Sequence, residues 1–246
     1  MDQPQSKSLT PSPLHQLYAN ILEHRYGGPA ENTNLNHFRL LIGSDIILDN
    51  YLGLGSLSVL LGLSPRIARS VLNRLQSFVI SNWDNTLSIQ NSSFKDFLTN
   101  EKACPPRFLI NLAEQHTILA RCCISIMNQL FQGPKVPEGD HIAYAICHFP
   151  EHLRGLVPES RMEFLENVRT FAYSQVAQWL ECLFQKDSHT NAVLFIKQVY
   201  QWVVSSLSPR LCSITNPFHN QANNFPGETE LLFVLKNLMV YTTILR

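Results

Sequence analysis

The stretch SLSVLLGLSPRIARSVLNRLQSFVISNWDNTLSI, residues 56–89, decides the fold of this protein. Apolar residues at helical spacing predict two short helices within it, over 56–61 and 65–75. Ser64 is a natural N-cap for the second helix, and Pro65 is tolerated at the first helical position. The two helices and the short connection between them therefore predict a helix-turn-helix.

Two apolar runs follow, 78–80 and 87–89, and they are typical of strands joined by a turn. Upstream, the spacing of apolar residues predicts two more helices, over 14–26 and 36–52. Helices, a helix-turn-helix and then a β-hairpin form the element order of a winged-helix domain. We therefore expect a mainly α fold that contains a winged-helix domain over 14–103.

The rest of the chain is expected to be helical throughout. One stripe of residues spaced by three and four predicts a long helix: Leu112, His116, Leu119, Cys123, Ile126 and Leu130. Because His116 lies on this apolar stripe, we expect it to be a hydrogen-bonded core histidine. The expected organisation is a disordered leader over 1–13, the winged-helix domain over 14–103, a helical domain over 104–210, a loop over 211–228 and a C-terminal helix over 229–246.

Composition excludes several classes of partner. The 246 residues hold 19 Lys and Arg against 19 Asp and Glu, so the net charge of zero argues against a general binder of nucleic acid or anionic membranes. Charged residues make up only 15%, against about 25% in a typical domain, which indicates a surface partly covered by a protein partner. Six cysteines without a C-x-x-C pair, and a polar N-terminus without a signal peptide, predict a cytoplasmic protein with no membrane contact.

Nucleotide and hydrolase motifs are missing from the sequence. There is no G-x-x-x-x-G-K-[ST], so the chain lacks the loop that cradles the β- and γ-phosphates of a nucleotide. There is also no G-x-S-x-G, H-E-x-x-H or G-x-G-x-x-G. We therefore expect neither a cofactor nor an enzymatic activity.

One zinc-type signature is present. His148-Phe149-Pro150-Glu151-His152 matches H-x-x-E-H, in which two histidines one helical turn apart share a metal and the glutamate acts as base. Pro150 lies between the two ligands and should bend the helix that must hold them in register. The expected role is a packed helix end, and a zinc peptidase built on His148, Glu151 and His152 is the weaker alternative.

A DNA-binding regulator is the other alternative. The second helix of the helix-turn-helix carries Arg66, Arg69 and Arg74, which could meet phosphates or guanine edges. Against this, the turn over 82–86 contains Asp84 and no basic residue to grip the neighbouring phosphates. We expect these arginines to solvate the outer face of the helix.

A family resemblance enters at the end of the hairpin. The run LSIQNSSFKDFLTN, residues 87–100, resembles the signature that closes the winged helix in fungal NACHT-type signal-transduction ATPases, the STAND or NOD-like proteins. Further segments resemble motifs of that family in the same order: LHQLYANIL at 14–22, LSVLLGL at 57–63, HTILARCC at 116–123 and AYAICHFPEHL at 143–153. The resemblance covers about residues 14–185 and identifies the H-x-x-E-H match as part of a structural helix.

The resemblance implies a switch protein that lacks the nucleotide-binding domain and the nucleotide-sensing histidine of its family. The family's P-loop domain would precede residue 14 and is absent from this chain. The winged-helix histidine thought to sense the nucleotide is replaced by Asn91, which cannot become cationic. We therefore expect a non-catalytic interaction or regulatory module, which could be a truncated product, with other NACHT or STAND chains as its partners.

Overall fold

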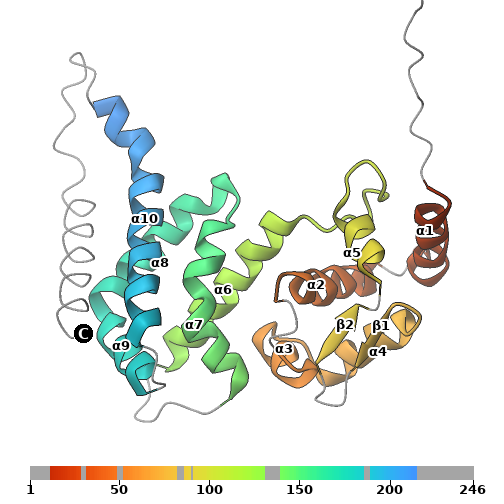
Figure 1. The fold of residues 1–246 in the computed structure, drawn as a ribbon, viewed down its shortest axis with the longest axis horizontal. Helices are drawn as coiled ribbons and strands as arrows, with labels where there is room; N and C mark the ends of the chain where they lie inside the picture. The colour runs from red at the N-terminus through yellow and green to blue at the C-terminus, as the bar shows by residue number, and fades with distance from the viewer. Residues whose placement is uncertain are drawn as a thin grey trace, which may run out of the picture. The chain divides into compact units, whose positions relative to one another are not determined.

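The computed structural model describes residues 12–28, 32–48, 52–81, 86–89, 91–130, 139–185 and 189–214 (Figure 1). The helices are α1 (Pro13–Tyr26), α2 (Asn32–Leu48), α3 (Leu54–Leu60), α4 (Pro65–Leu75), α5 (Ser92–Thr99), α6 (Leu112–Leu130), α7 (Asp140–Arg154), η1 (Pro158–Ser160), α8 (Arg161–Ser174), α9 (Val176–Gln185) and α10 (His189–Ile214). The strands are β1 (Val79–Ser81) and β2 (Leu87–Ile89). The prediction of a mainly α fold is confirmed.

The chain divides into two compact units. Unit 1 comprises Met1–Ser58 and Gly62–Leu112, and unit 2 comprises Val59–Leu61 and Ala113–Arg246. The predicted helix over 229–246, most of the predicted loop and nearly all of the predicted leader lie outside the described residues. Helix α10 reaches Ile214 and so extends past the predicted end of the helical domain at 210.

The boundary between the units lies further along the chain than the predicted one after residue 103. Cys104, Phe108 and Ile110 are buried, and the Ile110 amide donates to the carbonyl of Leu98 at 2.8 Å. The Arg39 guanidinium also holds this segment by donating to backbone carbonyl oxygens within it. These contacts attach 104–112 to unit 1 rather than to the helices that follow.

Helix α4 starts where its local signals predict, whereas α3 lies at Leu54–Leu60 and not at the predicted 56–61. The Ser64 hydroxyl caps α4 by accepting a hydrogen bond from the Ile67 amide at 3.3 Å. The inner face of α4 buries Ala68, Val71 and Leu75. Helix α2 packs against α4, and the opposite face of α4 is exposed to solvent.

Unit 1 closes around a short sheet and an aromatic cluster. Strands β1 and β2 pair antiparallel, with Val79 opposite Ile89. Tyr18 from α1 packs against Phe94 from α5 at 5.1 Å between ring centroids, and Phe94 stacks on Phe78 at 4.4 Å. These large side chains join α1 and α5 to the residue before β1.

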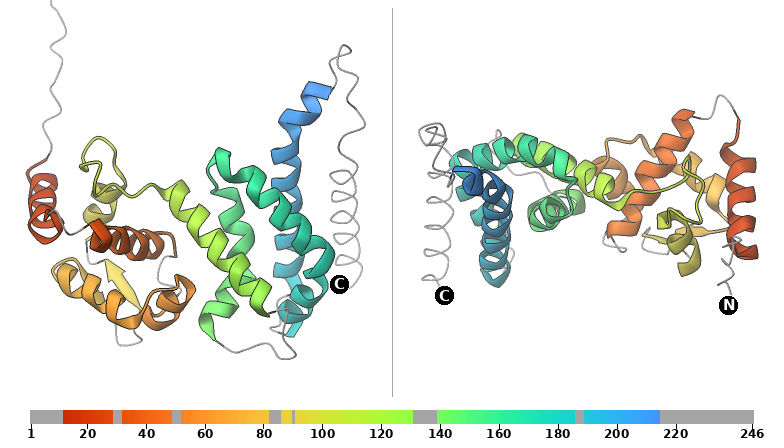
Figure 2. Two further views of the ribbon diagram at one scale, coloured as in Figure 1. Left: turned by 180° about the vertical axis from the view of Figure 1, so that it is seen from behind. Right: turned by 90° about the horizontal axis from the view of Figure 1, so that it is seen from above.

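Unit 2 is built from helices alone within the described residues. Helix α10 packs on α7, α8 and α9 (Figure 2). Trp179 of α9 is fully buried, and its indole N–H donates to the carbonyl of Ile146 in α7 at 2.8 Å. Among the described residues, no helix has the length and apolar character needed to cross a bilayer.

Candidate functional site

The H-x-x-E-H segment lies in the C-terminal half of α7. The helix continues through Pro150 to its last residue, Arg154, so the proline does not end it. His148 remains partly exposed, and its Nδ1 lies 3.4 Å from a carboxylate oxygen of Glu151. His152 is fully buried. The three residues of the signature thus differ sharply in their access to solvent.

Both ring nitrogens of His152 are already engaged. Its Nδ1 lies 3.0 Å from Nδ1 of His116, and its Nε2 lies 2.8 Å from the hydroxyl of Tyr144. Burial lowers the pKa of His152 to about 3, and the neighbouring His116 and His148 add to this shift. Burial also lowers the pKa of His116. Each imidazole is therefore neutral at pH 7, with one nitrogen donating and the other accepting.

This hydrogen-bonded group, His116, Tyr144 and His152, is called the histidine cluster below. A metal could bind His152 only if the ring gave up one of its two hydrogen bonds. In the part of the chain that the structure describes, no three His, Cys, Asp or Glu side chains are placed to hold a metal ion. The residues of the alternative zinc site therefore do not fit a metal in this arrangement.

A glycine lets α6 approach the end of α7 at the histidine cluster. A Cβ atom on Gly155 would lie 2.3 Å from Cγ of His116, so only glycine leaves room for this ring. Next to it, the Thr117 hydroxyl accepts a hydrogen bond from the Val157 amide at 3.4 Å. The cluster therefore ties α6 to α7. His116 is hydrogen-bonded as predicted, but it is half-buried and not a core residue.

Asn91, the position predicted to be a degenerate nucleotide sensor, is the N-cap of α5. Its side-chain oxygen accepts from the Ser93 amide at 3.0 Å and from the Ser93 hydroxyl at 2.7 Å. The Ser93 hydroxyl also lies 2.7 Å from the hydroxyl of Tyr18, which is buried in the aromatic cluster. These contacts give Asn91 a structural role that needs no nucleotide.

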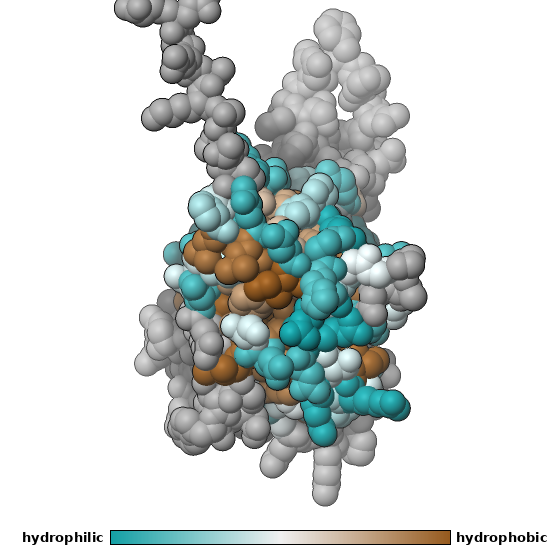
Figure 3. Space-filling model, turned by 90° about the vertical axis from the view of Figure 1, so that its right-hand side faces the viewer, coloured by the Kyte–Doolittle hydropathy of each residue, from teal (hydrophilic) through white to brown (hydrophobic). Residues whose placement is uncertain are grey.

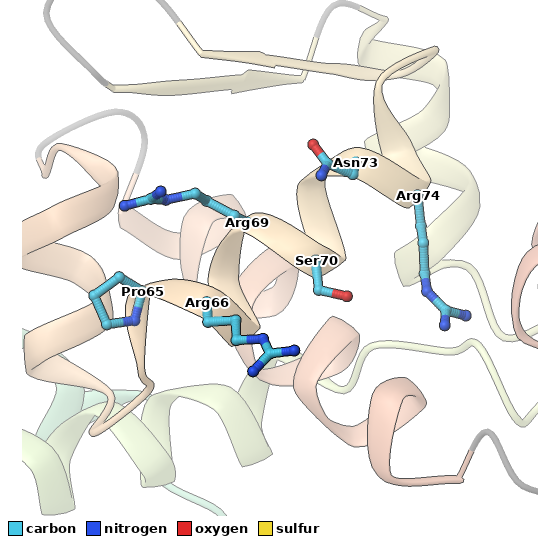
Figure 4. A pocket seen from close by; sticks show the side chains of 6 residues that line it. All are labelled: Pro65, Arg66, Arg69, Ser70, Asn73 and Arg74. Carbon is cyan, nitrogen blue, oxygen red and sulfur yellow. The ribbon is translucent and has the colours of Figure 1, made fainter.

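The three arginines proposed for DNA contact fall into two groups. Arg74 donates to the carbonyl of Arg25 at 2.7 Å, and its guanidinium lies 5.4 Å from the centroid of the Tyr26 ring. It therefore packs on the end of α1. Arg66 and Arg69 are exposed, and neither forms a hydrogen bond or ion pair with another described residue. Figure 4 shows Arg69 extending to one side of α4, with Arg66 and Arg74 on the other.

Two adjoining hollows flank these arginines. The first, the α4 hollow, has a volume of about 660 Å³ and is lined by Pro65, Arg66, Arg69, Ser70, Asn73 and Arg74 (Figure 4). The second, the α3–α4 groove, has about 610 Å³ and lies between α3, α4 and β1. Its lining includes Leu54, Gly55, Arg69, Leu72, Asn73 and Val79. Among the described residues, no acidic side chain lines either hollow.

The sequence indicates the arginines of this surface but not Ser70, Asn73 or the apolar lining of the groove. A signal for part of this surface was present. Positions 66, 69, 70 and 73 are spaced by three, four and seven residues from the first, so they share one helix face. The groove itself carries no local signal, because it depends on how α3 and β1 pack beside α4.

No family model, curated protein or solved structure matches the chain. The resemblance to NACHT-type ATPases therefore stays a prediction from the sequence segments that carry it. The candidate site rests on its own geometry, in which the exposed Arg69 lines a partly apolar groove and the exposed Arg66 lines the adjoining hollow.

Proposed function

We propose that this chain is a non-catalytic interaction module, and that unit 1 is a winged-helix domain whose partner is a NACHT-type protein chain. The element order supports the winged helix, because α3 and α4 precede the β1–β2 pair and α5 follows it. In the family that the sequence resembles, such a unit makes contacts between domains that form in one state and break in the other. A chain of this kind acts by occupying such an interface.

The observation that carries the proposal is an apolar stripe on the outside of α1. Leu14 is 40% exposed and Leu17 is 51% exposed, and the half-buried Ile21 continues the same helix face. In Figure 3, brown apolar surface is visible on the side of the molecule where α1 lies. Burial of such a side chain against a partner contributes about 1.5–3 kcal/mol. The low content of charged residues agrees with a surface that a partner covers.

Self-association tests the α1 stripe directly, since a second copy of the chain carries the same surfaces. We expect sedimentation velocity of the full chain to show association between about 1 and 100 µM, where a micromolar Kd populates both states. Leu17→Glu should abolish this association, because it places a charge in the apolar contact. Gln16→Glu adds the same charge at an exposed position of α1 on a different helix face from Leu17, and it should leave association intact. A chain that stays monomeric over this range would contradict the proposed interface.

The non-catalytic part of the proposal has its own test. We expect titration calorimetry with ATP to show no binding, because the glycines and lysine that cradle nucleotide phosphates are missing from the sequence. A dissociation constant in the micromolar range would overturn this part.

A DNA-binding regulator is a second candidate, favoured by one observation. Arg66 and Arg69 are exposed on the second helix of the helix-turn-helix, where such proteins place their base-reading residues. A duplex probe distinguishes this candidate in the experiment described below.

A further inference from the structure

We infer that the outer surface of α4 is a docking site for an acidic peptide segment of a partner protein. An aliphatic side chain of the segment enters the α3–α4 groove, and its carboxylates pair with Arg69 and Arg66. The inference rests on the proposed function only in treating the chain as a protein-binding module. It concerns a different surface from the α1 stripe and names the chemistry of the partner.

The outer surface of α4 carries positive charge that no described acidic residue balances. Arg66 and Arg69 have no acidic partner among the described residues, and the hollows beside them have no acidic lining. A guanidinium binds a carboxylate through two parallel hydrogen bonds, which gives this pair both strength and direction. A segment rich in Asp and Glu therefore supplies the charge that α4 lacks around its arginines.

The α3–α4 groove is partly apolar and open. Leu54, Leu72 and Val79 give it an apolar lining, and the Ser58 hydroxyl donates internally to the Leu54 carbonyl at 2.6 Å. Gly55 leaves open space, because no atom lies within 4 Å of the position that a Cβ would take. The groove is therefore free of protein side chains at this point and suits an aliphatic side chain of a ligand.

The two hollows share part of their lining. Arg69, Asn73 and Pro65 line both of them, so a ligand side chain in the groove lies beside the guanidinium of Arg69. The surface thus selects an aliphatic residue flanked by acidic ones. The side-chain amide of Asn73 offers a donor and an acceptor to the ligand backbone.

Charge balance favours a peptide over a nucleic acid. Residues 1–112 hold nine Lys and Arg against eight Asp and Glu, which leaves almost no net charge to attract a duplex. Duplex affinity depends on neutralising many phosphates at once. Phosphates also make no use of the apolar groove, whereas an acidic peptide with an aliphatic residue uses both features.

Panning a phage-displayed library of short random peptides against the full chain identifies the ligand class. The Gly55→Leu variant serves for counter-selection, because its side chain fills the open space in the groove while leucine favours the helix. We expect the selected peptides to be enriched in Asp and Glu next to Leu, Ile or Val. Selected peptides without acidic residues, or no enrichment at all, would overturn the inference.

The strongest selected peptide, labelled with fluorescein, is then measured by anisotropy against the full chain. We expect Arg69→Gln and Gly55→Leu each to weaken binding by about tenfold or more, equivalent to about 1.4 kcal/mol. Lys102→Gln removes a positive charge from an exposed residue that lines neither hollow, and it should leave the affinity unchanged. Circular dichroism of each variant checks that the fold is retained. Equal affinity of the Arg69→Gln variant and the unaltered chain would refute the site.

Two further measurements separate the alternatives. A labelled duplex of about 20 base pairs should bind no more tightly than the non-specific range of about 10⁻⁴–10⁻⁶ M. Nanomolar duplex binding that is lost in Arg69→Gln would replace the peptide site with a DNA site. Leu17→Glu should leave peptide affinity unchanged, so failure of the α1 interface and failure of the α4 site give different results.

Discussion

The histidine cluster in unit 2 and the arginine pair on α4 in unit 1 are the two places where the sequence suggested chemistry, and they differ in how their polar groups are satisfied. In the cluster, His152 uses both ring nitrogens on protein partners and is fully buried. On α4, Arg69 lines the α3–α4 groove and Arg66 lines the adjoining α4 hollow, and neither bonds to another described residue. We call the first arrangement closed, because its polar groups bond to protein partners, and the second open, because its polar groups are available to a ligand.

This difference teaches which polar residues serve the fold and which are available to a ligand. A buried polar group costs free energy unless it is hydrogen-bonded, so a satisfied buried group stabilises the packing around it. An exposed guanidinium near the surface costs little to hold and can exchange water for a carboxylate. Substitutions in the closed region should therefore change stability, whereas substitutions in the open region should change binding.

The largest effect is expected beneath the open surface. Leu75 lies on the inner face of α4 and is fully buried, so Leu75→Ala removes packed methyl groups and leaves a cavity. We expect the free energy of unfolding of unit 1 to fall by about 2–5 kcal/mol in urea denaturation followed by circular dichroism. A loss below about 1 kcal/mol would mean that α4 is not the rigid platform that the docking site requires.

The closed cluster should respond to pH. Below the ordinary histidine pKa of 6.5 the unfolded chain takes up a proton, whereas folded His152 stays neutral because its pKa is lowered to about 3. The free energy of unfolding of unit 2 is therefore highest above pH 6.5, and it falls by about 2–3 kcal/mol between pH 6.5 and pH 4.5. The urea dependence of tryptophan fluorescence measures this in a Trp83→Phe background, which keeps Trp179 and Trp202 of unit 2. His152→Gln should flatten the dependence, and a matched change in unit 1, His24→Gln, should not.

Two glycines allow a direct comparison between the regions. Gly155→Ala forces a Cβ to within 2.3 Å of the His116 ring, and we expect it to lower the free energy of unfolding of unit 2 by about 1–3 kcal/mol. Gly55→Ala adds the same atom at the open groove, where it meets nothing, and should be neutral or stabilising by up to about 1 kcal/mol. Thermal or urea denaturation measures both. Equal losses at the two glycines would show that the groove is not open.

Asn91 shares features of both regions, because its side-chain oxygen is hydrogen-bonded while the residue itself is exposed. Asn91→Ala removes the cap of α5 and should lower the free energy of unfolding of unit 1 by about 0.5–2 kcal/mol. Asn91→Ser keeps a capping oxygen and should recover most of this loss in the same denaturation experiment. Full stability of the alanine variant would leave a nucleotide-related role as the better explanation of Asn91.

Local sequence signals predicted the parts of the fold that local chemistry determines. Ser64 and Pro65 mark the start of α4 because one supplies the cap and the other needs no amide donor at that position. The boundary predicted after residue 103 places 104–112 in the following domain, since this segment carries no signal of its own. Its attachment to unit 1 depends on distant contacts, such as the Ile110 amide with the Leu98 carbonyl.

The candidate site shows the same limit. The H-x-x-E-H match places His148 and His152 one turn apart, and the sequence alone leaves a metal possible there. The partner that engages His152 from outside the helix is His116, 36 residues earlier, and such a separation leaves no pattern in the sequence. The groove beside α4 leaves no pattern in the sequence either, because Gly55 and Val79 line it together only in the folded chain.

The smallest expected effect is the one that most sharply separates the two regions. Arg66→Ala and Arg69→Ala should each change the free energy of unfolding of unit 1 by less than about 0.5 kcal/mol, since both guanidinium groups are exposed and neither bonds to another described residue. Urea denaturation of the two variants beside Leu75→Ala measures this on the same helix. A loss above about 1 kcal/mol for either arginine would show that it holds the fold together. A stable Arg69→Ala variant that no longer binds the acidic peptide would instead show that this charge serves a partner.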